Sequence, residues 1–297
     1  MTNTRLFRWS LSMLVVCAAC AAAGAGQVGD AQRSIRNVDF RNYTYSPACV
    51  EQGATVKVTG GTYERSDPED PMYFEVQRVV YGDLTRDGID EAVVQTICNT
   101  GGTGQFSDGI VFTMRGGKPA AVATLGMGDR ADGGIHAIRI DDGLLVVDRY
   151  GQESSGACCP EYVESYRLRY DGKRFVETGR PVRRIFLSLT RENTSGPMRV
   201  RFLKGTSSAA LSGSTNGGER YVLGVRANQT LDVAFASKDA RSTVKITTAS
   251  GKRLMTLRPN EQWSGLLPES GDVTIAIEST TGADSTEAYF DIDISVR

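Results

Sequence analysis

This sequence has very little histidine and almost no net charge. Its 297 residues include one histidine, His136, and its 34 Lys and Arg are balanced by 35 Asp and Glu. This balance excludes the chain-wide basic surface typical of nucleic-acid-binding proteins. A single histidine excludes most zinc hydrolases. No serine lies in a G-x-S-x-G motif, so the sequence does not identify a serine nucleophile. We therefore expect a binding protein rather than an enzyme, with His136 as a half-buried structural residue on the strand face of Ile138 and Ile140.

No apolar run is long enough for a transmembrane helix, which needs ~20 residues. Residues 11–23 form a short apolar run after two cations, and small residues follow at Ala23-Gly24-Ala25. This pattern predicts a secretory signal peptide over residues 1–25. Ala18-Ala19-Cys20 also resembles the end of a bacterial lipobox, so ordinary cleavage and lipid anchoring at Cys20 both stay open. We expect a periplasmic or secreted protein that meets the membrane only through such an anchor.

Four cysteines remain after residue 25: Cys49, Cys98, Cys158 and Cys159. An even number of cysteines in an exported protein indicates two disulfides. Adjacent cysteines rarely bond to each other, so we expect Cys158 and Cys159 each to pair with one of the other two. The sequence leaves open which cysteine pairs with which.

The composition and the turn pattern favour an all-β, mainly antiparallel protein of two domains. Glycine is abundant, with 33 residues, whereas no segment has the period of a long helix. We expect a disulfide-containing β-rich domain over residues 34–179 and a β-sandwich over residues 184–297, separated where Gly179 and Pro181 interrupt the strand pattern. Residues 27–183 carry 18 cations and 23 acids, whereas residues 184–297 carry 14 cations and 12 acids.

Short β-branched and aromatic runs predict a meander in the first domain. The expected strands are 72–81, 92–98, 109–114, 135–140 and 144–147, followed by a hairpin of 166–170 with 174–176 around Asp171-Gly172. In the second domain, apolar residues at 290, 292, 294 and 296 alternate with polar ones. This period of two places one strand face in a core and predicts an antiparallel sandwich.

One acidic loop has the spacing of a calcium site. Oxygen ligands at alternate positions of a glycine-containing loop can converge on one hard cation. Here the candidate ligands are Asp83, Thr85, Asp87, the Ile89 carbonyl and Glu91. The loop resembles the strand–loop–strand calcium turns of FG-GAP-type repeats, from which Thr85 and the neighbouring Arg86 depart. The alternative is a tight turn whose carboxylates accept hydrogen bonds from backbone amides.

Three segments of the second domain resemble the β-sandwich of periplasmic inhibitors of g-type lysozyme and of related pre-peptidase C-terminal modules. They are 201–208, 221–231 and 263–272, the last containing Leu-Pro-Glu-Ser-Gly-Asp. The resemblance implies an inhibitory loop at Ser270 and Gly271, although Val273 stands where an aromatic residue often follows. Binding also needs aromatic or arginine side chains at the interface, and we nominate Tyr221, Arg226, Arg253 and Trp263, with a place in the core as the alternative for Trp263.

The first domain is similar to uncharacterised exported bacterial proteins of the LppP/LprE type, a resemblance that implies no activity. The expectation is an exported envelope binding protein that inhibits a lysozyme through its second domain. The alternative is a calcium-stabilised adhesion or carbohydrate-binding module that recognises cell-wall glycan without inhibiting an enzyme.

Overall fold

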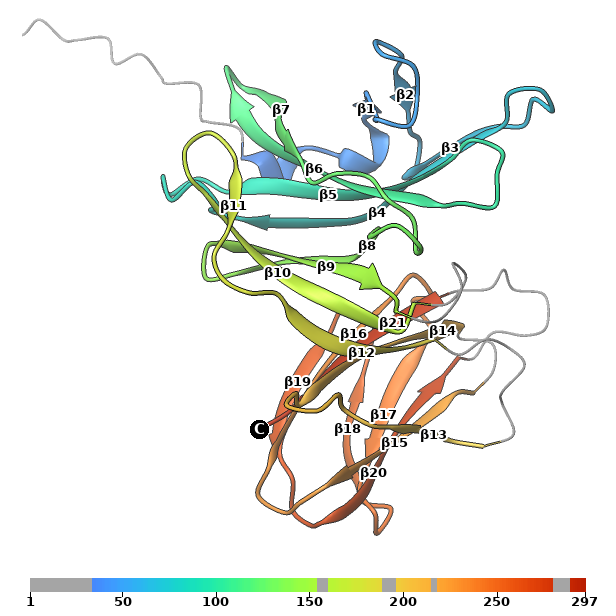
Figure 1. Ribbon diagram of the computed structural model, residues 1–297, viewed down its shortest axis with the longest axis vertical. Helices are drawn as coiled ribbons and strands as arrows, with labels where there is room; N and C mark the ends of the chain where they lie inside the picture. Colours follow the sequence, from blue (N-terminus) through green and yellow to red (C-terminus); the bar gives the residue numbers. More distant parts are fainter. Residues whose placement is uncertain (1–33, 154–159, 189–195, 215–217, 280–288) are drawn as a thin grey trace, which may run out of the picture.

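The computed structural model describes residues 34–153, 160–188, 196–214, 218–279 and 289–297, which form β-sheets without any α-helix (Figure 1). Two short 3-10 turns, η1 (Ile35–Asn37) and η2 (Phe40–Asn42), precede the strands. None of the helical turns in these ranges is long or apolar enough to span a membrane. The predicted signal peptide, Cys20, Cys158 and Cys159 lie outside the described residues.

The first half contains a meander that includes the expected strands 72–81, 92–98 and 109–114, whereas 135–140, 144–147 and the hairpin around Asp171-Gly172 belong to a different sheet. Five consecutive strands pair antiparallel in chain order. They are β3 (Thr62–Arg65), β4 (Met72–Gly82), β5 (Glu91–Asn99), β6 (Phe106–Arg115) and β7 (Lys118–Thr124). The central strand β5 is buried on both faces, because Val94 packs into one core and Val93 into another. The first core is closed by η1, η2 and the pair β1 (Thr44–Tyr45) and β2 (Val56–Lys57).

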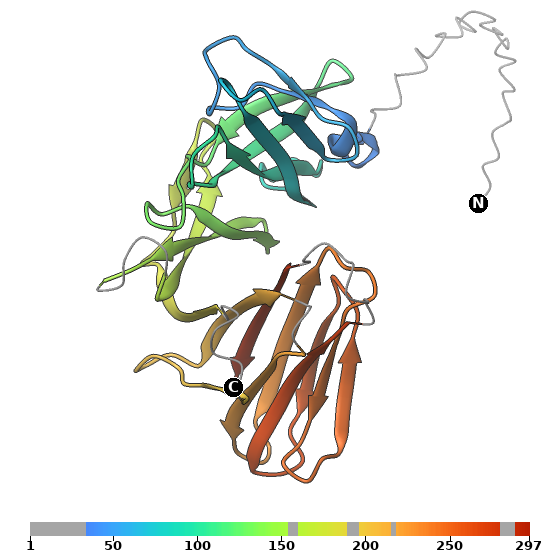
Figure 2. The ribbon, with the colours of Figure 1, turned by 90° about the vertical axis from the view of Figure 1, so that its right-hand side faces the viewer.

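A second, longer sheet runs through both halves of the chain. Its order is β19-β16-β21-β14-β12-β10-β9-β8, with β11 paired to β10. Its strands from the first half are β8 (Ile135–Asp141), β9 (Leu144–Gly151), β10 (Tyr162–Tyr170), β11 (Phe175–Glu177) and β12 (Val182–Ser188). β12 pairs antiparallel with β10 and parallel with β14 (Ser208–Ser214). The segment expected to separate two domains therefore leads directly into a strand that joins them (Figure 2).

The C-terminal half is the predicted β-sandwich. The long sheet contributes β14, β16 (Thr230–Ser237), β19 (Gln262–Leu266) and β21 (Tyr289–Val296). The facing sheet consists of β13 (Met198–Val200), β15 (Arg220–Val225), β20 (Gly271–Glu278), β17 (Thr243–Thr247) and β18 (Arg253–Leu257). The alternation expected in the last strand is confirmed, since Phe290, Ile292 and Ile294 are all buried in the sandwich core.

Cys49 and Cys98 form a disulfide with each other, with their Cα atoms 6.5 Å apart. The expectation that each would pair with Cys158 or Cys159 is therefore wrong. Cys98 lies on β5, and Cys49 packs against the same core from the loop between β1 and β2. The meander brings these two segments together, a juxtaposition that cysteine spacing does not reveal.

The expected environment of His136 also needs correction. The register of β8 against β9 shifts between Ile135 and Ala137, so His136 is the extra residue of a β-bulge. Its ring contacts Tyr150 and Phe186, with ring centroids 5.2 and 5.1 Å away. Because the bulge breaks strict alternation, His136 faces a different cluster from Ile138.

Candidate functional site

The acidic loop joins β4 to β5, and its carboxylates accept hydrogen bonds from the loop itself. Asp83 accepts bonds from the amides of Asp87 and Gly88, at 3.1 and 2.9 Å. Asp87 accepts a bond of 2.8 Å from the Ile89 amide. These contacts are the tight-turn arrangement that the sequence offered as the alternative to calcium.

Glu91, the last of the predicted ligands, points into the protein. It is 1% exposed, and its Oε2 accepts bonds from the amides of Leu84 and Thr85, at 2.9 and 3.1 Å. Its Oε1 lies 3.5 Å from the Thr85 hydroxyl and 3.3 Å from the Thr113 hydroxyl. Burial raises the pKa of Glu91, although these donors lower it in part. Both oxygens are thus engaged, so Glu91 does not fit a calcium ligand set.

The described residues contain no group of three or more His, Cys, Asp and Glu side chains placed to hold a metal ion. Both oxygens of Asp83 also accept amide hydrogen bonds, and the Thr85 hydroxyl is directed at Glu91. Calcium binding by this loop therefore stays a prediction that the observed hydrogen bonds do not support.

The predicted inhibitory residues lie at one end of the sandwich, which we call the distal end. The strand β21 ends at the distal end. The first half of the chain instead contacts the sandwich at Asp291, near the start of β21, and at Lys238, just after β16. The Ser270 hydroxyl accepts a bond of 2.8 Å from the amide of Ala227. This bond ties the loop before β20 to the loop after β15, although the two residues are 43 positions apart.

Gly271 begins β20 in a backbone conformation that glycine favours. Its φ is +136°, and a Cβ at this position would lie 2.7 Å from the Cβ of Ala249. Only a residue without a side chain lets β20 approach the β17–β18 hairpin this closely. Ser270 and Gly271 thus both shape the distal end.

A shallow groove of about 470 Å³ opens at the distal end. Its lining combines apolar side chains with an arginine, an amide and an acid: Phe202, Ser207, Gly224, Val225, Arg226, Gln229, Gly271, Asp272 and Val296. Arg226 is exposed, and its side chain has no acidic partner among the described residues. Its backbone amide donates to the Gln229 side chain at 2.7 Å, which holds the loop in a turn.

The acids near the groove are already paired. Asp272 accepts two bonds from the Arg199 guanidinium, at 3.0 and 2.5 Å, and this pairing lowers the pKa of Asp272. Glu269 accepts bonds from the amide and hydroxyl of Ser250 at 2.9 and 2.7 Å. The Thr248 hydroxyl and these Ser250 donors lower the pKa of Glu269 to about 2. The distal end therefore offers Arg226, which has no acidic partner among the described residues, beside two ionised acids that are held by Arg199 and by the Ser250 donors.

Two of the other nominated residues lie elsewhere. Tyr221 is fully buried in the sandwich core, where its ring packs against Phe290 at a centroid distance of 6.3 Å. It therefore presents no surface to a partner, contrary to the expectation. Arg253 is exposed at the start of β18, paired in register with Thr247, and does not line the groove.

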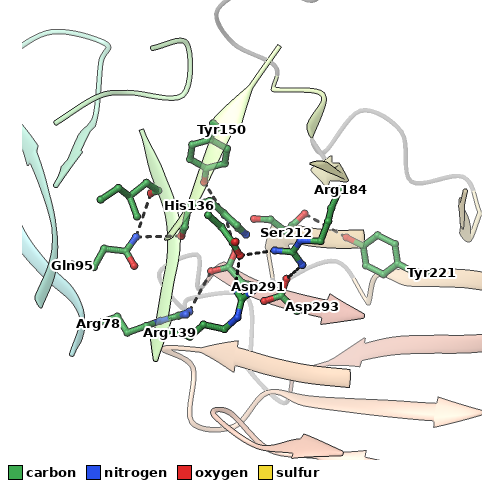
Figure 3. A network of polar contacts seen from close by, with 12 residues as sticks. Arg78, Gln95, His136, Arg139, Tyr150, Arg184, Ser212, Tyr221, Asp291 and Asp293 are labelled. Carbon is green, nitrogen blue, oxygen red and sulfur yellow. Dashed lines mark hydrogen bonds and ion pairs between the residues drawn. The ribbon is translucent and has the colours of Figure 1, made fainter. Parts of the chain in front are cut away.

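A polar cluster where the two halves meet was not anticipated from the sequence (Figure 3). The Arg184 guanidinium contacts Asp148 and Asp293, each at 2.5 Å, and Arg139 contacts the same Asp148 oxygen at 2.8 Å. His136 lies 3.1 Å from the Tyr150 hydroxyl. Burial alone would lower the pKa of Arg184, but the two carboxylates outweigh it and raise this pKa. The cluster links strands of both halves.

Comparison with known proteins shows no matching family model and no matching curated protein. Among solved structures, PliG from Aeromonas hydrophila, a periplasmic inhibitor of g-type lysozyme, is 21% identical over 38% of this chain and 97% of its own, with a TM-score of 0.31. Salmonella Typhimurium PliG is 20% identical over 35% of this chain and 100% of its own, at a TM-score of 0.27. An exo-β-1,3-galactanase from Phanerochaete chrysosporium is 11% identical over 81% of this chain and 82% of its own, at 0.19.

Proposed function

We propose that this protein is an exported envelope protein that binds a partner through the distal end of its sandwich, and that the partner is a lysozyme. The observation that carries the proposal is that Gly271 and Arg226 line one groove, while Ser270, next to Gly271, is hydrogen-bonded to the loop that carries Arg226. Two of the sequence segments that resemble lysozyme inhibitors supply these residues, and they are brought together by the Ser270–Ala227 hydrogen bond.

The chemistry of the groove suits such a partner. Glycoside hydrolases cleave their substrates with paired carboxylates, so a lysozyme cleft is acidic. The exposed Arg226 guanidinium can form a bidentate contact with a carboxylate, while the nearby acids Asp272 and Glu269 are held by their own donors. Arginine is among the residues that contribute most at protein interfaces.

Export is supported by a second observation. Disulfides persist in oxidising compartments and are rare in the cytosol, and Cys49 and Cys98 are joined in the first half. The signal-like N-terminus points to the same compartment. We therefore place the protein in the periplasm or outside the cell.

The test is the turnover of a g-type lysozyme on a cell-wall substrate, titrated with the purified protein. We expect stoichiometric loss of activity. Arg226→Gln should weaken inhibition about tenfold, as expected for an arginine at the centre of an interface. Arg220→Gln is the matched control, because Arg220 is exposed at the start of β15, whereas Arg226 directly follows the end of that strand. Full activity of g-type, c-type and i-type lysozymes at micromolar protein would overturn the proposal.

A further inference from the structure

Three buried side chains meet on one face of the long sheet, at the join between the two halves. Ser165 on β10 lies directly opposite Asp148 on β9, and Arg184 on β12 lies opposite Val163. Because β10 lies between β12 and β9, the Arg184 side chain must cross β10 to reach Asp148, which it contacts at 2.5 Å. The Arg184 side chain therefore passes over the part of β10 that carries Ser165.

Each of these side chains has one polar atom without a hydrogen-bond partner among the described residues. The atoms are Asp148 Oδ1, Ser165 Oγ and Arg184 Nε. Asp148 is fully buried, and Ser165 and Arg184 are each 7% exposed. Native proteins satisfy nearly all buried polar atoms with protein or ordered water, so three such atoms on one face of adjacent strands indicate a bound group.

The chemistry of the three atoms selects that group. An ionised carboxylate only accepts hydrogen bonds, a guanidinium only donates them, and a hydroxyl does either. The bound group must therefore donate to Asp148 and accept from Arg184. A metal cation would be repelled by the two guanidinium groups of Arg184 and Arg139, and an anion would be repelled by Asp148. A water molecule meets both requirements, and buried waters typically have two to four polar partners.

We propose that Asp148, Ser165 and Arg184 form the binding site of one buried water molecule. This water completes a network that ties the two halves together, since Asp148 also contacts Arg139 on β8 and Arg184 also contacts Asp293 on β21. The network thus extends over five strands of the long sheet, four from the first half and one from the sandwich. This water site would be present whatever partner the protein binds.

The direct test is a high-resolution crystal structure of the protein. We expect an ordered water within ~2.6–3.2 Å of Asp148 Oδ1, Ser165 Oγ and Arg184 Nε, the normal hydrogen-bond range. An anomalous signal from an ion at this position, or side chains that pair directly and leave no water between them, would overturn the proposal.

A solution test compares two variants by urea denaturation. Ser165→Ala removes one partner of the water, so the folding equilibrium constant should fall about fivefold, the usual effect of one lost hydrogen bond. Thr256→Val is the control, because the Thr256 hydroxyl is also buried without a partner but lies on β18, away from the network. It should leave stability unchanged or raise it. A Ser165→Ala protein as stable as Thr256→Val would contradict the proposal, and the crystal structure decides if Ser165→Ala does not fold.

Discussion

The Arg184 guanidinium crosses β10 to reach the Asp148 carboxylate, with Nη2 and Oδ2 2.5 Å apart. Asp148 is completely buried, so its charge is compensated by Arg184 and Arg139 and not by bulk water. A buried ion pair adds little stability compared with a well-packed apolar pair, but removal of one partner leaves an uncompensated charge. The join between the halves should therefore be sensitive to single substitutions in this network.

The first prediction is that Arg184→Met lowers the free energy of unfolding by about 3–5 kcal/mol, the usual cost of breaking a buried ion pair. Urea denaturation measures this loss. Arg183→Met is the control, because Arg183 lies on the opposite face of β12 and pairs with the partly exposed Glu153 and Glu164. Exposed ion pairs contribute about 0–1 kcal/mol. Equal losses in the two variants would show that the network does not stabilise the join.

Local features of the fold could be predicted from the sequence, but its long-range pairing could not. The alternation in residues 290–296 and the hairpin around Asp171-Gly172 follow from side-chain period and turn chemistry, and both are present. The parallel pairing of β12 with β14 depends on segments that are distant in sequence. No local pattern in the sequence distinguishes a buried arginine such as Arg184 from an arginine in a linker. The sequence therefore did not predict the sheet that the two halves share.

The residues of the candidate site could likewise be predicted from the sequence only in part. Ser270, Gly271 and Arg226 were selected from sequence segments; Gly271 and Arg226 line one groove, and Ser270 is bonded to Ala227 next to Arg226. Tyr221 was selected because it is aromatic. It shares one buried face of β15 with Leu223 and Val225, which lie two and four positions later. That period of two is visible in the sequence and could have identified Tyr221 as a core residue.

The second prediction concerns the close approach of β20 to the neighbouring hairpin. In Gly271→Ala, the new Cβ would lie 2.7 Å from the Cβ of Ala249, in a conformation with φ of +136°. Gly251→Ala also places alanine at positive φ, but nothing lies within 4 Å of its Cβ. We expect Gly271→Ala to lower the free energy of unfolding by about 1–3 kcal/mol more than Gly251→Ala does, which is the typical cost of overpacking. Similar urea midpoints for the two variants would be inconsistent with a crowded Gly271.

The third prediction links the distal loops to binding, and it rests on the proposed function. Ser270→Ala removes the acceptor that holds the Ala227 amide and so frees the loop carrying Arg226. Inhibition of lysozyme should weaken about fivefold, the effect of one lost hydrogen bond, while stability changes little because Ser270 is exposed. Ser66→Ala, at an exposed serine of the first half, is the control. Unchanged inhibition by Ser270→Ala would mean that this bond does not position the binding loop.

The fourth prediction concerns the acidic loop. Because its carboxylates accept bonds from loop amides, we expect EDTA to leave the thermal midpoint unchanged and added calcium not to raise it. Glu91→Gln should lower the free energy of unfolding by about 1–3 kcal/mol, because the new side-chain NH2 group would point at hydrogen-bond donors that it cannot pair with. Asp87→Asn, which changes an exposed carboxylate that accepts only one amide, should cost less. A calcium-dependent rise in the midpoint that Asp87→Asn abolishes would restore the calcium hypothesis.

The fifth prediction is a pH dependence that originates in Glu269. The Thr248 and Ser250 donors lower its pKa in the folded protein to about 2, from an ordinary value of 4.5. A carboxyl group whose pKa is lower in the folded state stabilises the fold above its unfolded pKa, and this contribution disappears as the group is protonated. The stabilisation should therefore be complete above pH 4.5 and decline towards pH 2. The urea midpoint of the native protein should fall more steeply over this interval than that of Glu269→Gln, whereas Glu51→Gln, at an exposed loop acid, should follow the native curve. Parallel curves for the native protein and Glu269→Gln would show that the Thr248 and Ser250 hydrogen bonds do not stabilise the charged form.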